Sequence, residues 1–194
     1  MLDVMAGERL QRMGAKREAV FTTEQVTALL GLKAADKWRV TKFVQSREYG
    51  ISPSITDAAG PGSRRLYDLE NVCEIGLALR LLEAGLRPKV IGHVLKELRQ
   101  DGKLSRKLKI EKDRVPIRYL GICLFPKIGK PLDVSRVIYV DFFDGFMEAE
   151  PILGQLTEPD ALGPNVDVLF VAVGLVFHRI NERLEIMEAE RGKP

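Results

Sequence analysis

The side chains with the clearest binding chemistry lie in two short stretches, residues 38–45 and 64–67. In the first, helical spacing of about 100° per residue places Val40, Phe43 and Val44 on one apolar side. The opposite side carries Trp38, Thr41, Lys42 and Gln45, with Arg39 at the border. Lysine and glutamine bond base edges in a major groove, while threonine or tryptophan packs on a thymine methyl. This pattern predicts a helix that inserts into duplex DNA. The alternative is a plain surface helix whose Trp38 packs against a neighbouring loop.

The second stretch follows a turn rich in glycine and proline, Gly60-Pro61-Gly62. Arginines after such a turn reach phosphates or a narrow minor groove, and Arg64 and Arg65 fit that role. Tyr67 adds a phenolic hydroxyl that can donate to a phosphate. The alternative is that these side chains are simply solvated. A basic run further along serves either as additional phosphate attraction or as an ordinary linker: Lys103, Arg106, Lys107 and Lys109.

Catalytic and metal chemistry has little support in the sequence. His93 and His178 stand in apolar, helical patterns, where core or boundary histidines are common, and metal-ligand spacing is absent. Cys73 and Cys123 are predicted to be small core residues. The dense acidic cluster suits acid-base or metal chemistry but is more typical of a strand end and solvated loop: Asp141, Asp144, Glu148 and Glu150. We therefore predict no enzyme activity, no cofactor and no metal site.

The helices that position the first stretch are indicated by their caps. Thr22 and Gln25 fit a capping box before an apolar run that Gly31 ends. A second helix is predicted from about residue 34 to 47. The glycine- and proline-rich residues that follow, up to Tyr67, are predicted to form a hairpin.

Two further helices follow this hairpin. Asp68 is a candidate N-cap for the third helix, and Pro88 suits the first turn of the fourth. The third is expected to place one apolar face inward: Val72, Ile75, Leu79 and Leu82. The fourth carries a similar face: Val90, Ile91, Val94, Leu95 and Leu98.

In the second half of the chain, the spacing of the apolar residues changes from that of helices to that of strands. Residues 117–125, 134–143 and 166–173 are predicted to be strands. A final helix is predicted from residue 174 to about 191, with an apolar stripe at heptad-like spacing: Val176, Ile180, Leu184 and Met187. This stripe either forms a dimer contact or packs in the core.

The order helix, tight turn, helix, glycine-rich hairpin and two more helices is that of a winged helix-turn-helix. Five short stretches resemble the MerR family of bacterial transcription regulators. They are Phe21-Thr22-Thr23-Glu24-Gln25-Val26, Gly31-Leu32, Gly50-Ile51-Ser52-Pro53, Arg65-Leu66-Tyr67 and Leu82-Glu83-Ala84-Gly85-Leu86. In the family these correspond to the opening strand and first helix, the turn, the start and end of the wing, and the junction of the last two helices. The resemblance covers residues 20–98.

The resemblance implies a regulator that binds duplex promoter DNA as a homodimer, with RNA polymerase as a further partner. Two departures from the family pattern limit what is carried over. Between Gly31 and Gly50 the chain is longer than usual, and Val40-Thr41 stands where the family has paired aromatics. The three metal-binding cysteines of the family's mercury sensors are absent, so no metal site is implied.

The 194 residues divide into a longer basic part and a shorter acidic part. Residues 1–116 hold 22 Lys and Arg against 15 Asp and Glu, whereas residues 117–194 hold 8 against 12. A basic half suits a polyanionic partner, although chance variation is the alternative. The predicted fold class is α+β. It comprises a lead-in (1–19), a MerR-like winged helix-turn-helix (20–100), a basic linker or helix (101–116) and a small β-rich α/β domain with a C-terminal helix (117–194).

Partners and location follow from the same features. The β-rich domain is expected to bind a small effector molecule or another protein. The early charges exclude a secretory signal, the apolar runs are too short to cross a membrane, and only two cysteines are present, so a cytoplasmic location is predicted. Two other function classes stay open. One is an architectural or excisionase-like DNA-binding accessory protein, and the other is a ligand-binding protein or enzyme whose winged domain does not bind DNA.

Overall fold

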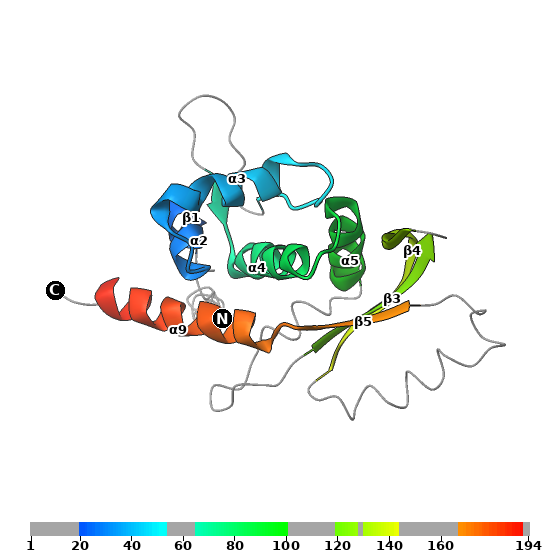
Figure 1. Cartoon of the computed structure of the whole chain (residues 1–194). Helices are drawn as coiled ribbons and strands as arrows, with labels where there is room; N and C mark the ends of the chain where they lie inside the picture. Colours follow the sequence, from blue (N-terminus) through cyan, green and yellow to red (C-terminus); the bar gives the residue numbers. More distant parts are fainter. Residues whose placement is uncertain (1–19, 54–64, 101–118, 128–129, 144–166, 192–194) are drawn as a thin grey trace, which may run out of the picture.

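The computed structural model of the chain describes residues 20–53, 65–100, 119–127, 130–143 and 167–191. Within these ranges the fold mixes helices and strands, with two small antiparallel sheets, and is of the α+β class (Figure 1). Several predictions lie outside the described residues. They concern the lead-in 1–19, Gly60-Pro61-Gly62, Arg64, the basic run within 101–116, and Asp144, Glu148 and Glu150.

The first helix begins and ends where its local sequence predicts. It follows β1 (Phe21–Thr22) and spans α2 (Thr23–Leu29). The Gln25 N–H donates to Thr22 Oγ1 over 3.4 Å, and the Thr22 N–H donates to Gln25 Oε1 over 2.9 Å. These two bonds form the predicted capping box. At the other end Gly31 has a φ of +68°, a conformation that glycine adopts without steric cost, and the chain reverses there.

The second helix is shorter and less regular than predicted. It opens with a 3-10 turn, η1 (Ala34–Asp36), and continues as α3 (Lys37–Gln45). The expected end near residue 47 is wrong, because Ser46 is already extended. The chain turns there so that Tyr49, 3% exposed, packs edge-on against Phe43 with ring centroids 4.6 Å apart. Burial of that aromatic pair outweighs one further turn of helix.

The end of the predicted hairpin pairs with a strand from the start of the fold, far away along the chain. Strand β2 (Leu66–Tyr67) lies antiparallel to β1, with Phe21 opposite Tyr67 and Thr22 opposite Leu66. Because side chains alternate along a strand, Phe21 and Tyr67 both face the core and are 0% exposed. This small sheet joins the start of the fold to the segment that precedes the third helix.

The third helix, α4 (Leu69–Glu83), is the centre of the core. Its predicted N-cap is confirmed, since Asp68 Oδ1 accepts from the Asn71 N–H over 2.8 Å. Helices α3, α5 (Pro88–Gln100) and α9 (Gly174–Arg191) all contact it, so every residue from 71 to 79 is buried rather than one face alone. The expectation for Leu82 is wrong. It is 37% exposed, whereas Leu81, beside it in the same turn, is 0% exposed, so the last turn of α4 buries Leu81 in place of Leu82.

The fourth helix, α5 (Pro88–Gln100), begins at the predicted proline and buries all five predicted apolar residues. Gly92 lets the loop after α3 approach α5. A Cβ at that position would come within 1.9 Å of the Glu48 carbonyl oxygen. The loop therefore rests directly on the α5 backbone.

The second half supplies a three-stranded sheet and a helix. Strands β3 (Tyr119–Lys127), β4 (Lys130–Phe143) and β5 (Asp167–Ala172) pair antiparallel in the order β4-β3-β5. The three predicted strands are thus confirmed, with shifted ends. Leu120, Ile122 and Val171 join the hydrophobic core, each at most 3% exposed.

The last helix, α9 (Gly174–Arg191), packs against α4 and α2 from the first half of the chain (Figure 1). Phe177 and Ile180 are each 1% exposed. The rest of the predicted stripe is partly buried against the same core: Val176, Leu184 and Met187. Of the two roles predicted for this stripe, packing in the core is therefore the one observed.

Candidate nucleic-acid interface

Helix α3 has the two-sided character that its spacing predicts. Val40 is 0% exposed and Phe43 is 3% exposed, and both face the core. On the other side the side chain of Trp38 is 59% exposed, and Lys42 and Gln45 are exposed as well. The remaining two predicted residues, Arg39 and Thr41, are half-buried. The structure therefore brings all five predicted side chains of this helix to one accessible surface or its border.

The outer side of α3 carries hydrogen-bond donors and acceptors together with an apolar ring. The Thr41 hydroxyl donates to the Lys37 carbonyl over 3.4 Å, which uses its proton and leaves its oxygen able to accept a hydrogen bond. Lys42 adds an ammonium with three donors, and Gln45 adds an amide that both donates and accepts. Trp38 contributes a broad apolar ring beside them. This combination suits hydrogen bonds to base edges together with contact to apolar base atoms.

The start of α3 is tied to α2. Lys37 Nζ forms an ion pair with the carboxylate of Glu24, in the first turn of α2. The hydrogen bond from Lys37 holds the pKa of the Glu24 carboxyl below its usual value. Both side chains are largely exposed, so the pair adds little to stability. The pair links the first turn of α2 to the first residue of α3.

A buried polar cluster fixes the chain just after α3. The Glu74 side chain is 3% exposed and pairs with the Arg99 guanidinium of α5. Arg99 Nη1 also donates to the Gly50 carbonyl over 2.9 Å. Asn71 Nδ2 donates to the Ser52 carbonyl over 3.1 Å and to Glu74 Oε2 over 3.2 Å. Residues 50–52 are thus anchored to α4 and α5 where the chain enters the stretch 54–64.

This polar cluster was not predicted from the sequence. A signal for it exists, because Glu74 interrupts an otherwise apolar helical run between Cys73 and Ile75. A carboxylate at such a position is buried only when a cation and other donors surround it. Its partner Arg99 lies on the next helix, and no local pattern identifies that pairing.

The predicted wing residues have different outcomes. Arg64 lies outside the described residues, and Arg65 is half-buried immediately before β2. The expectation that Tyr67 contacts a phosphate is wrong, because its side chain is 0% exposed. Pairing with Phe21 turns Tyr67 toward the core, so it anchors the end of the stretch rather than its surface.

The described residues hold no candidate metal centre. They contain no group of three or more histidine, cysteine or acidic side chains able to hold a metal ion. His93 is exposed on α5, while His178 lies 3.4 Å from the Glu182 carboxylate on the surface of α9. Cys73 is buried in α4, and loss of solvation raises the pKa of its thiol, which keeps it a neutral core residue.

Comparisons with known proteins do not assign this surface. No protein-family model matches the chain, and no curated protein matches it either. Within the described part of the chain, no helix is both long enough and apolar enough to span a membrane. The geometry of α3 and its supports is therefore what a functional proposal must rest on.

Proposed function

We propose that this protein binds duplex DNA as a MerR-type transcription regulator, with α3 in the major groove and the stretch 54–64 as a wing. The observation that carries the proposal is that α3 has one buried apolar side and one exposed polar side. Its inner residues Val40 and Phe43 are at most 3% exposed, while Trp38, Lys42 and Gln45 stand exposed on the outer side. A helix firmly packed on one side and rich in donors on the other is the form that major-groove readers use.

The anchoring of the wing's two ends supports the same proposal. Before the wing, Gly50 and Ser52 are held by Arg99 and Asn71. After it, β2 is paired with β1 at the start of the fold. A wing whose ends are fixed in this way can place Arg64 and Arg65 on the phosphates that flank the groove. The resemblance to the MerR family further suggests that the protein acts as a homodimer. Its site would then be promoter DNA that RNA polymerase also binds.

The first test is the selection of binding sites from pooled random duplex DNA at two salt concentrations. An inverted-repeat motif, with affinity that falls steeply as salt rises, would support a dimeric sequence-specific regulator. Retention without a motif would support an architectural DNA-binding protein instead. If the protein retains no DNA even at low salt, the proposal is wrong.

Single substitutions then locate the interface. We expect Lys42→Ala and Gln45→Ala each to weaken binding to the selected site by about tenfold, or about 1–2 kcal/mol, because each loses a contact to a base edge. Fluorescence anisotropy with a labelled duplex measures this.

The matched control is Arg191→Ala. It removes an exposed cation from α9, which lies across α4 from α3 (Figure 1). This variant should bind like the unmodified protein, and a loss as large as that of Lys42→Ala would point to general charge attraction rather than to α3.

A further inference from the structure

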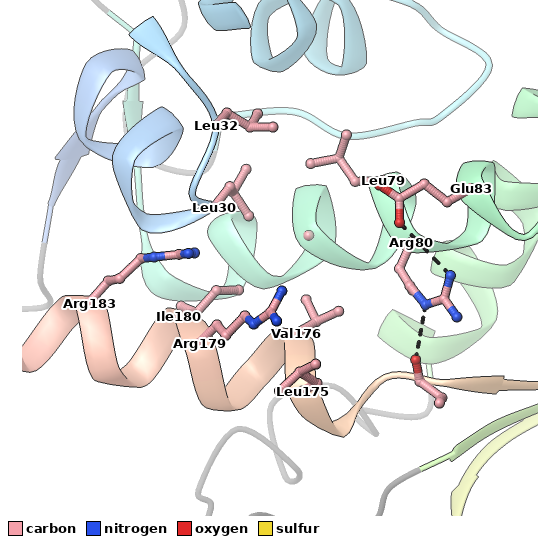
Figure 2. Close-up of a pocket in the computed structure, with 12 residues that line it drawn as sticks. Leu30, Leu32, Leu79, Arg80, Glu83, Leu175, Val176, Arg179, Ile180 and Arg183 are labelled. Atoms are coloured by element: carbon pink, nitrogen blue, oxygen red, sulfur yellow. Dashed lines mark hydrogen bonds and ion pairs between the residues drawn. The ribbon is translucent and has the colours of Figure 1, made fainter.

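A cavity of about 360 Å³ lies between α4, α9 and the turn after α2 (Figure 2). Much of its lining is apolar: Leu30, Leu32, Leu79, Leu175, Val176 and Ile180. Gly76 of α4 completes the lining without adding a side chain. The volume falls within the range of small-molecule sites, and apolar walls of this kind hold the body of an organic ligand.

Three arginines share this cavity with a single carboxylate. Arg80 comes from α4, and Arg179 and Arg183 come from α9 (Figure 2), while Glu83 is the one acidic group in the lining. The lining therefore carries an excess of positive charge. This contrasts with the second half of the chain as a whole, in which acidic residues outnumber basic ones.

Two of these guanidiniums are held in place by the backbone. Arg183 Nη1 donates to the Leu29 carbonyl at the end of α2 over 3.1 Å. Arg80 Nε donates to the Ala172 carbonyl at the end of β5 over 3.2 Å, and its Nη1 lies 3.8 Å from the Glu83 carboxylate. Each guanidinium has five N–H donors, so these contacts leave donors unused.

Arg179 is different. It is exposed to solvent and makes no hydrogen bond or ion pair within the described residues, and it extends from α9 toward α4 at the cavity (Figure 2). Three cations and one carboxylate line this partly apolar space, and an anion bound there offsets part of the excess positive charge. Arginine is also the side chain that matches a carboxylate with two parallel hydrogen bonds.

We propose that this cavity binds a small organic acid, with its carboxylate at Arg179, between Arg80 and Arg183, and its apolar body against the leucines. The inference goes beyond the proposed function and does not depend on it, because none of the lining residues belongs to α3. The ligand class follows from the combination of an apolar lining with an excess of guanidinium groups.

The experiment compares two acids with their uncharged counterparts on the full chain. Octanoate and 2-naphthoate are titrated by calorimetry beside 1-octanol and 2-naphthamide, which keep the apolar bodies but lack the charge. We expect at least one acid to bind at millimolar concentration or below, and about tenfold more tightly than its neutral counterpart. If neither acid binds, or if the neutral compounds bind equally well, the proposal is wrong.

A substitution in the lining and the NMR signals of the arginine side chains test where the acid binds. Arg179→Gln should weaken the acid by about tenfold, because it removes the guanidinium with no other partner in the described residues. Arg191→Gln, on the same helix but outside the lining, should leave the affinity unchanged. In arginine-labelled protein, the Nε–H signal of Arg179 should shift on binding. Equal losses in both variants, or shifts confined to other arginines, would overturn the assignment.

Discussion

Glu74 shows how a single residue can hold two parts of this fold together. Its carboxylate is buried within α4 and is paired with Arg99 of α5, while Asn71 donates to the same carboxylate. Arg99 and Asn71 also bind the carbonyls of Gly50 and Ser52. One polar cluster therefore connects two helices with the segment that leads toward the proposed wing.

We expect Glu74→Gln to lower the free energy of unfolding by about 2–3 kcal/mol. The substitution keeps the shape of the side chain but leaves the partly buried Arg99 charge without its counterion. Urea unfolding followed by circular dichroism measures the change. Glu97→Gln removes an exposed carboxylate from α5 and should change stability by less than about 0.5 kcal/mol. A double-mutant cycle with Arg99→Gln should show strong coupling, and purely additive losses would contradict the role of the pair.

At the scale of elements, the crossing of α4 and α9 depends on the absence of a side chain at Gly76. A Cβ there would lie 2.9 Å from Val176 Cγ1, 3.1 Å from Leu30 Cδ2 and 3.2 Å from Ile180 Cδ1. Glycine in the middle of a helix normally costs stability relative to alanine. Here it allows the two helices to approach closely, and the packing gained compensates for that cost.

Gly76→Ala tests this crossing because the two effects have opposite signs. Helix propensity alone predicts a gain of about 1 kcal/mol, whereas overpacking costs about 1–3 kcal/mol. We expect a net loss of about 1 kcal/mol in urea unfolding. In a Val176→Ala background, which removes the nearest atom, the loss should shrink or reverse sign. A stabilised single variant would mean that α9 does not pack against α4 at this point.

Elements with local signals could be predicted from the sequence, and elements that depend on distant partners could not. The capping box at Thr22, the reversal at Gly31 and the cap at Asp68 each involve residues within a few positions, and all three are confirmed. The burial of Tyr67 depends on pairing with Phe21, far away along the chain, and was predicted wrongly. For the same reason the outer face of α3 could be predicted from spacing, but the polar cluster that supports it could not.

For the molecule as a whole, the helix at the end of the chain belongs to the core formed by its first half. Phe177 and Ile180 are almost completely buried, and α9 contacts both α2 and α4. Arg183 reinforces this by donating to the last carbonyl of α2. The N-terminal helices therefore lack part of their core without residues from the end of the chain.

Ile180→Ala and Leu175→Ala form a matched pair that tests this integration. Ile180 is 1% exposed and Leu175 is 51% exposed on the same helix. We expect a loss of about 2–4 kcal/mol for Ile180→Ala, because it leaves a cavity in the core, and less than about 1 kcal/mol for Leu175→Ala.

The single tryptophan, Trp38 on α3, reports unfolding of the first half by fluorescence, while circular dichroism reports all helices. If α9 shares the core, Ile180→Ala must move both signals to lower urea together. A fluorescence transition that stays in place while the circular dichroism transition shifts would show that α9 unfolds separately, and that the first half needs no support from it.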